Sequence, residues 1–196
     1  MRQVYHRPDP LELAKMPANT SRGLLHICDR WIRVIVKGFH PGESLPRAEV
    51  KVLAIASGGG HWVQLQRLRP AFDGCDIAFA TVRSGYREDV SGARFYVVPD
   101  SNIREKLALV RTALTVLTVL LRERPHVIIS TGAAPGYFAI LFGKWIGART
   151  IWLDSIANAE KLSLSGQKAG RYADLWLTQW AHLARESGPK FYGSVI

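Results

Sequence analysis

Short apolar runs alternate with amphipathic stretches from residue 51 to the end of the chain. The runs are almost continuously apolar, which is typical of parallel strands that are covered on both faces. They lie at residues 51–56, 76–81, 94–98, 126–130, 150–153 and 174–178. Helical patterns separate most of them, at residues 62–72, 104–124, 136–146 and 165–172. The alternation predicts an α/β domain built on a doubly wound parallel sheet of about six strands.

A different pattern precedes this region. Residues 21–37 form an amphipathic helical pattern with a mostly basic polar face, and residues 41–46 (PGESLP) have the composition of a linker. The apolar face of this pattern carries Leu24, Ile27, Cys28, Trp31, Val34 and Ile35. We therefore expect an N-terminal extension over residues 1–49 and a domain over residues 50–196. The helix fits two interpretations equally, an interfacial membrane helix or a helix packed on the domain.

Residues 107–121 (LALVRTALTVLTVLL) are apolar on nearly every side, and Arg111 is their only charge. The segment falls short of the ~20 residues that a membrane span needs. It is predicted to be the crossover helix between two strands, buried on one side. Its outer face can still reach a membrane.

Composition narrows the class of protein. Hydrophobic residues make up 47% and charged residues 21% of the 196 residues, which indicates a globular chain. The net charge of +10 is spread, with 8 Lys and Arg against 5 Asp and Glu up to Glu49 and 18 against 11 after it. Phosphate-bearing substrates or an anionic membrane explain this excess better than nucleic acid, because no nucleic-acid-binding motif is present.

The two cysteines, Cys28 and Cys75, form no zinc or disulfide pattern, so we expect neither a metal nor a cofactor. The first 17 residues have no apolar core of the signal-peptide type, and a reducing, cytoplasmic setting fits.

Two glycine-rich loops follow predicted strands, where open α/β sheets bind their ligands. Three glycines let the backbone approach a ligand, and a following helix N-terminus favours an anion. The first loop comprises Ser57, Gly58, Gly59, Gly60 and His61. The imidazole of His61 suits proton transfer, although a histidine here can equally be a hydrogen-bonding residue. The second loop contains Thr131 and Gly132 and is expected to form another wall of the same crevice, or to be a tightly packed turn.

Two further loops carry polar side chains directly after strands. In the third loop, Asp154 and Glu160 can act as a base or orient a hydroxyl, and Asp154 can instead cap a helix. Ser155 and Asn158 face the same crevice in this interpretation. The fourth loop contains Gln179 and Trp180, and the indole can stack on a sugar or pack in the core.

In this order, the segments SGGGHWVQLQRL, STGAAPG, WLDSIANAEKLSLSG, ADLWLTQW and FYGSVI resemble one family. It contains the membrane-recruiting subunit of the eukaryotic UDP-GlcNAc transferase that extends dolichol-linked GlcNAc, and the PssD-like subunits of bacterial exopolysaccharide glucuronosyltransferases. The resemblance covers roughly residues 51–196 and is stronger to the bacterial branch, especially through DSIANAEKLSLSG and LTQW.

This resemblance implies a Rossmann-like, GT-B amino-terminal domain whose partner subunit supplies the nucleotide-sugar half. It implies transfer of a sugar, glucuronic acid in the bacterial branch, from a UDP-sugar to a polyprenyl-diphosphate-linked saccharide. The related single-chain enzyme MurG has a comparable loop ending in histidine, which makes His61 the first candidate base, with Asp154 and Glu160 behind it.

The expected location is the cytoplasmic face of the inner membrane, with peripheral attachment. The alternative hypothesis is a non-catalytic scaffold that recruits the catalytic subunit to the membrane.

Overall fold

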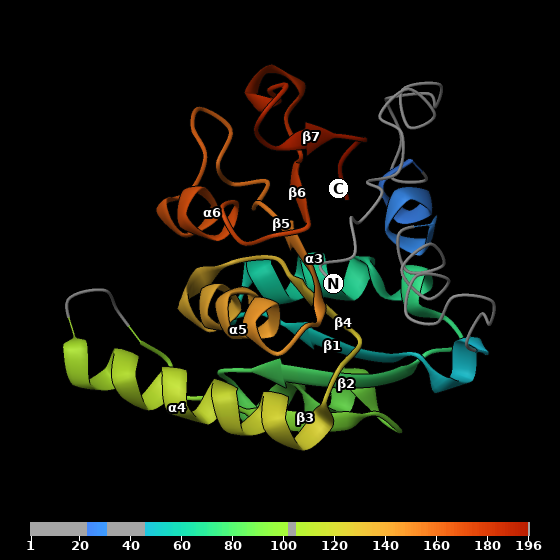
Figure 1. Cartoon of the computed structure of the whole chain (residues 1–196), viewed down its shortest axis with the longest axis vertical. Helices are drawn as coiled ribbons and strands as arrows, with labels where there is room; N and C mark the ends of the chain where they lie inside the picture. The colour runs from blue at the N-terminus through green and yellow to red at the C-terminus, as the bar shows by residue number, and fades with distance from the viewer. Residues whose placement is uncertain (1–22, 31–45, 102–104, 196) are drawn as a thin grey trace, which may run out of the picture.

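A seven-stranded parallel sheet forms the centre of the molecule (Figure 1). The computed structural model describes residues 23–30, 46–101 and 105–195. The strands follow the order β3-β2-β1-β4-β5-β6-β7. Their bounds are β1 (Lys51–Ile55), β2 (Asp76–Thr81), β3 (Arg94–Val97), β4 (Val127–Ser130), β5 (Arg149–Leu153), β6 (Leu175–Thr178) and β7 (Lys190–Phe191). The six predicted strands are confirmed, and β7 is an additional short strand at the edge.

The order of the strands reverses between β1 and β4. The chain runs outward from β1 through β2 to β3, returns to β4 beside β1, and then continues through β5, β6 and β7 on the other side. Right-handed crossovers place the connections of the two halves on opposite faces of the sheet. The sheet is therefore doubly wound, as predicted, and its switch point lies where β1 and β4 end.

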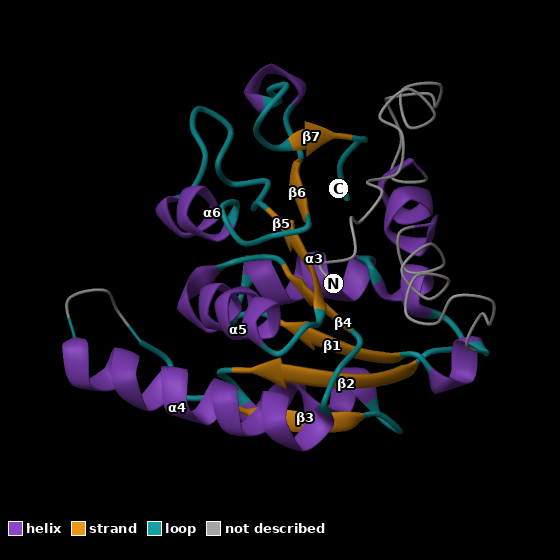
Figure 2. Ribbon diagram, in the orientation of Figure 1, coloured by secondary structure: helices purple, strands orange, loops and turns teal. Residues whose placement is uncertain are grey.

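Helices cover both faces, as Figure 2 shows. In Figure 1, α4 and α5 lie on the viewer's side of the sheet and α3 lies behind it. Beyond the helix of residues 23–30, the α-helices of the described ranges are α3 (Gly60–Arg67), α4 (Lys106–Glu123), α5 (Ala133–Trp145) and α6 (Leu164–Ala169). The 3₁₀ segments are η1 (Arg47–Glu49), η2 (Arg69–Phe72), η3 (Ser84–Val90) and η4 (Ala181–Leu183). The expected helix at 62–72 is thus divided into α3 and η2, because Pro70 lacks the amide hydrogen that a continuing α-helix needs.

Each face of the sheet has its own hydrophobic core. Alternate residues of β1 belong to different cores: Val52 and Ala54 pack with Trp62 of α3, whereas Leu53 and Ile55 pack with residues of α4 and α5. This alternation is the consequence of side chains pointing to opposite faces along a strand. It explains why the strands are apolar at nearly every position.

The helix of residues 23–30 packs into the core on the α3 side. Leu24, Ile27 and Cys28 are fully buried and share this core with Val50 and Val52. The interfacial-membrane interpretation of this apolar face is therefore wrong for these residues, because they are fully buried in this core. Trp31, Val34 and Ile35 lie outside the described residues. Arg47 contributes to the same attachment through an ion pair of 2.5 Å with Asp29.

The crossover helix α4 is buried along one side only, as its sequence predicts. Val116 and Leu120 are fully buried, and Leu107 and Leu114 are exposed. Glu123, near its C-terminal end, is buried and pairs with Arg94, whose Nε lies 2.9 Å from its carboxylate. No helix in the described ranges combines the length and the apolar content that crossing a membrane requires.

Candidate functional site at the switch point of the sheet

The loops that follow β1 and β4 meet at the switch point, where ligands bind in open α/β sheets. The first loop leads from β1 into α3, and Gly59 at its end has a φ of 64°, which glycine adopts without steric penalty. The second loop leads from β4 into α5 through Thr131 and Gly132. Residues 70 positions apart in the chain are thereby brought into contact.

His61, in the first turn of α3, is held by the second loop. Its Nδ1 lies 2.8 Å from the carbonyl oxygen of Thr131, and the Thr131 hydroxyl donates a hydrogen bond of 2.7 Å to the carbonyl oxygen of His61. A carbonyl oxygen only accepts hydrogen bonds, so Nδ1 of the neutral ring carries the hydrogen and Nε2 keeps its lone pair. Among the described residues, Nε2 makes no hydrogen bond. The ring is thus fixed in the tautomer that can accept a proton at Nε2.

Gly132 allows this close approach. Its φ is 143°, and a Cβ atom added there would overlap Cε1 and Nδ1 of the His61 ring. The glycine is therefore needed for the position of the histidine. Gly132 was expected to form a wall of the crevice. In the structure it makes room for the His61 ring to lie against Thr131.

A cavity of about 630 Å³ opens beside His61. Its wall is formed by α5 at Ala133, by the segment between β5 and α6, and by the first turn of α6, and it combines polar side chains with leucines. The lining residues are His61, Ala133, Asn158, Lys161, Leu162, Ser163, Leu164, Ser165 and Gln167. The half-buried His61 and Asn158 are the two predicted site residues that line this cavity.

Asp154 is buried beneath the cavity wall rather than lining it. Only 2% of the residue is exposed. Its carboxylate accepts hydrogen bonds from the backbone amide and the hydroxyl of Ser163, at 2.9 and 2.6 Å, and from the amide of Ser155. Ser163 in turn caps α6 by accepting a hydrogen bond from the amide of Gly166. Asp154 thus fixes the loop that carries Asn158 and Lys161, and the helix cap considered for Asp154 is made by Ser163 instead.

Gln179 and Ser155 belong to a buried polar network between α3 and the last strands. The Gln179 side-chain amide donates to Gln64 Oε1 and to the carbonyl oxygen of Asp154, both at 3.0 Å, and its oxygen accepts from the amide of Val195. Gln64 also donates to the Ser155 hydroxyl at 3.2 Å. These two predicted substrate-binding side chains therefore have partners within the protein.

The remaining predicted site residues lie at the same edge of the sheet without lining the cavity. Glu160 is exposed. Trp180 is half-buried, and its indole donates a hydrogen bond of 2.8 Å to the carbonyl oxygen of Ile156. The carbonyl oxygen of Ser57 accepts from the hydroxyl of Thr81. The structure thus brings together His61, Thr131, Gly132 and Asn158, and leaves Glu160 and Trp180 at the periphery.

Two cationic residues at this edge were not predicted. Arg83 follows β2 and lies against Gly58: a Cβ atom at Gly58 would be 3.0 Å from its Nε. Lys161 lines the cavity directly. Both are exposed. The sequence contains a signal for each, because Arg83 stands just after a strand and Lys161 lies within the segment DSIANAEKLSLSG.

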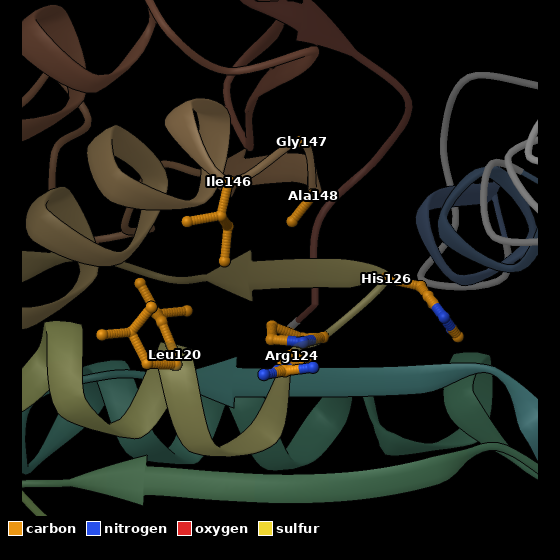
Figure 3. A pocket seen from close by; sticks show the side chains of 8 residues that line it. Leu120, Arg124, His126, Ile146, Gly147 and Ala148 are labelled. Atoms are coloured by element: carbon orange, nitrogen blue, oxygen red, sulfur yellow. The ribbon is translucent and has the colours of Figure 1, made fainter.

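A second, smaller cavity of about 320 Å³ lies at the opposite edge of the sheet, between the C-terminal ends of α4 and α5. Figure 3 shows the side chains of Leu120 and Ile146 projecting into it from the two helices, with Arg124 beside them. This cavity is remote from the His61 loop, because β4 and β5 begin here and end at the candidate site.

The fold belongs to a known class of domain. The chain is similar to the crystal structure of Acinetobacter baumannii MurG, with a TM-score of 0.61 at 10% identity, over 74% of this chain and 45% of that chain. The domain is therefore a Rossmann-like domain of the GT-B amino-terminal type. The chain spans less than half the length of that structure.

The family follows from the sequence comparisons. Residues 90–195, more than half of the chain, match the model of the family described as oligosaccharide biosynthesis protein Alg14 like, and the chain belongs to this family. A curated relative from Eremothecium gossypii, the UDP-N-acetylglucosamine transferase subunit ALG14, is 27% identical over 79% of this chain and 83% of its own length. The protein of the same name from Yarrowia lipolytica is 31% identical over 38% of each chain.

Proposed function

We propose that this chain is the acceptor-side subunit of a two-subunit glycosyltransferase. It transfers a sugar from a UDP-sugar donor to a polyprenyl-diphosphate-linked saccharide, and a second glycosyltransferase subunit supplies the nucleotide-sugar-binding half. The observation that carries the proposal is His61, fixed by Thr131 at the switch point with Nε2 directed to accept a proton. Membership of a family whose curated relatives are named transferase subunits supports the need for a partner.

In this reaction the acceptor hydroxyl attacks the anomeric carbon of the donor sugar. A bond forms between the acceptor oxygen and that carbon, and the bond from the carbon to the diphosphate oxygen breaks. The hydroxyl proton passes to His61 Nε2, and the electron pair of the broken bond leaves with UDP. General bases of this kind contribute about 10²–10⁴-fold to a rate.

The cavity beside His61 suits an acceptor that carries both hydroxyls and phosphates. Asn158 and Ser165 supply neutral hydrogen-bonding groups, and Lys161 supplies a positive charge. Arg83 adds a second positive charge beside the glycine-rich loop. Cations in such positions compensate the negative charge of a diphosphate, and fixed positive groups also stabilise charge that develops in the transition state.

The identity of the sugar is the finer part of the proposal. The motif DSIANAEKLSLSG suggests glucuronic acid and exopolysaccharide biosynthesis, whereas the curated relatives are named for UDP-N-acetylglucosamine. We propose glucuronic acid as the donor sugar and peripheral attachment at the cytoplasmic face of the inner membrane. UDP-N-acetylglucosamine is the donor that a direct comparison must include.

The test is a reconstitution of the pair. The tagged full-length chain is isolated from its source cells together with its bound subunit and assayed with a polyprenyl-diphosphate-linked saccharide and either UDP-glucuronic acid or UDP-N-acetylglucosamine. The proposal expects transfer by the pair and none by the chain alone. Robust transfer by the isolated chain contradicts the two-subunit proposal. An assembled pair that keeps its full rate after His61→Ala supports the scaffold alternative.

A further inference from the structure

The outer surface of α4 and α5 combines exposed apolar side chains with unopposed positive charge. The apolar side chains form what is here called the α4–α5 face: Leu107, Val110, Leu114, Leu121, Trp145 and Ile146. Leu107 is 89% exposed, Leu114 61% and Trp145 71%. Leaving such side chains in water is unfavourable, so several of them on two neighbouring helices indicate a surface that binds a lipid bilayer or another molecule.

The exposed positions of α4 follow one stripe along the helix. Leu107, Val110, Leu114 and Leu121 recur at helical spacing, so they point to the same side. The exposed cations Lys106, Arg111 and Arg122 flank this stripe, Lys106 on one side and the two arginines on the other. The only acidic residue within α4, Glu123, is buried and paired with Arg94, and the exposed Glu105 stands just before the helix.

The neighbouring helix α5 extends this surface with aromatic rings. The centroids of Phe138 and Phe142 are 5.9 Å apart, and those of Phe142 and Trp145 are 5.6 Å apart. Phe138 and Phe142 are half-buried and Trp145 is exposed. Tryptophan at the end of such a row is typical of side chains that lie at the boundary between lipid headgroups and acyl chains.

The smaller cavity joins the two helices at one end of this face. Leu121 and Ile146 line it from α4 and α5, and Arg124 stands beside them (Figure 3). An apolar hollow beside a guanidinium group suits the glycerol region of a phospholipid, whose phosphate can then bind the arginine.

We infer that the α4–α5 face binds the surface of an anionic lipid bilayer. The exposed cations of α4, with no exposed acidic residue within that helix, favour an anionic lipid surface over a protein partner, because anionic headgroups attract lysine and arginine side chains. At a bilayer the apolar side chains enter the acyl boundary while the long cationic side chains reach the headgroups. The apolar face of the helix of residues 23–30 is not available in this way, since Leu24, Ile27 and Cys28 are fully buried.

This orientation also brings the membrane to the candidate site. In a parallel sheet, each helix that follows a strand begins at the carboxyl edge, so Leu107 at the start of α4 lies at the same edge as the loop of His61. A lipid-linked saccharide that emerges from the bilayer beside Leu107 therefore reaches the edge of the sheet at which the His61 cavity lies. In this point the inference deepens the proposed function and rests on it.

The experiment is co-sedimentation of the full-length chain with vesicles of phosphatidylcholine, with and without phosphatidylglycerol. We expect binding to the anionic vesicles that weakens as salt is raised. The double variant L107S/L114S should lower the partition coefficient about tenfold or more, because two buried leucine side chains are lost from the bilayer. Neutralising Arg111 and Arg122 with glutamine should lower binding to the anionic vesicles by roughly fivefold per charge.

The matched control is Val97→Ser. Val97 is 47% exposed at the end of β3, away from the α4–α5 face, and its replacement should leave vesicle binding unchanged. Thermal unfolding of every variant verifies that the fold is intact. The inference is overturned if the wild-type chain does not bind the anionic vesicles, if L107S/L114S binds them as well as wild type, or if Val97→Ser weakens binding equally. It is also overturned if, in the complex isolated from source cells, L107S/L114S releases the bound subunit while vesicle binding by the chain persists. The vesicle assay itself contains no donor and no partner, so its outcome is separate from that of the transfer assay.

Discussion

The imidazole Nδ1 of His61 lies 2.8 Å from the carbonyl oxygen of Thr131, 70 residues further along the chain. This contact joins the loops of the two innermost strands at the switch point. It determines that Nδ1 of the neutral ring carries the hydrogen. Nε2 is therefore the nitrogen that can accept a proton from a substrate hydroxyl. The predictions below test this site and the packing around it.

Replacement of Gly132 by alanine should disable the site without unfolding the protein. The new Cβ atom would overlap the His61 ring and force the imidazole away from Thr131. We expect the transfer rate of the assembled pair to fall by about tenfold or more, since misplaced catalytic groups lose much of their contribution. Imidazole nitrogen NMR should also show loss of the Nδ1-protonated tautomer. Gly85→Ala is the control, because nothing lies within 4 Å of its added Cβ atom.

Truncation of Leu24 should destabilise the whole domain. Its side chain is fully buried in the core on the α3 side, so Leu24→Ala should lower the free energy of unfolding by about 2–5 kcal/mol. Leu114→Ala, at an exposed position, should change it by no more than about 0.5 kcal/mol. Urea denaturation of both variants gives the comparison. Equal, small effects would mean that the N-terminal helix does not share the core.

The thiol of Cys28 should be unreactive in the folded protein. Burial, with a smaller contribution from Asp29, raises the pKa of Cys28 to about 12. Because the thiolate is the reactive form, labelling near pH 8 should be slowed far beyond the rate of a free thiol. A Cys75→Ser variant leaves Cys28 as the only thiol and allows its labelling to be timed. Rapid labelling without denaturant would contradict the packing of this helix.

Removal of the Asp154 carboxylate should loosen the cavity wall. Asp154→Ala leaves the amide and hydroxyl of Ser163 without their acceptor and should lower the free energy of unfolding by about 1–3 kcal/mol. The loop that carries Lys161 should then become more accessible to protease. An unchanged stability and cleavage rate would show that this carboxylate does not hold the loop and would return it to the list of candidate bases.

Much of the fold was predictable because its pattern is local. The strands are continuous apolar runs, and α4 shows its buried and exposed sides in the spacing of its residues. The strand β7 escaped prediction because the two residues Lys190 and Phe191 leave no pattern. The burial of Leu24 in the domain core could not be decided from the sequence for another reason. An amphipathic helix has the same sequence pattern whether its apolar side packs on a protein core or on a lipid.

The candidate site was predictable only in its outline. Polar residues after strands indicated the edge of the sheet at which the larger cavity lies, and His61 and Asn158 line that cavity. The sequence does not reveal that Ser163 turns back to bind Asp154, or that Gln179 has its partners in Gln64 and Val195. Such partners are distant in the chain, and no local pattern records them.

In the proposed reaction, Nε2 of His61 takes the proton of the acceptor hydroxyl. The most direct measurement is the single-turnover transfer rate of the assembled pair with His61→Ala, compared with wild type and with His182→Ala. His182 is an exposed histidine outside the cavity, and its Nε2 contacts the carbonyl oxygen of Ala159. We expect a loss of about 10²–10⁴-fold for His61→Ala with the two subunits still associated, and a near wild-type rate for His182→Ala. A wild-type rate for His61→Ala in an intact pair would contradict this role of His61.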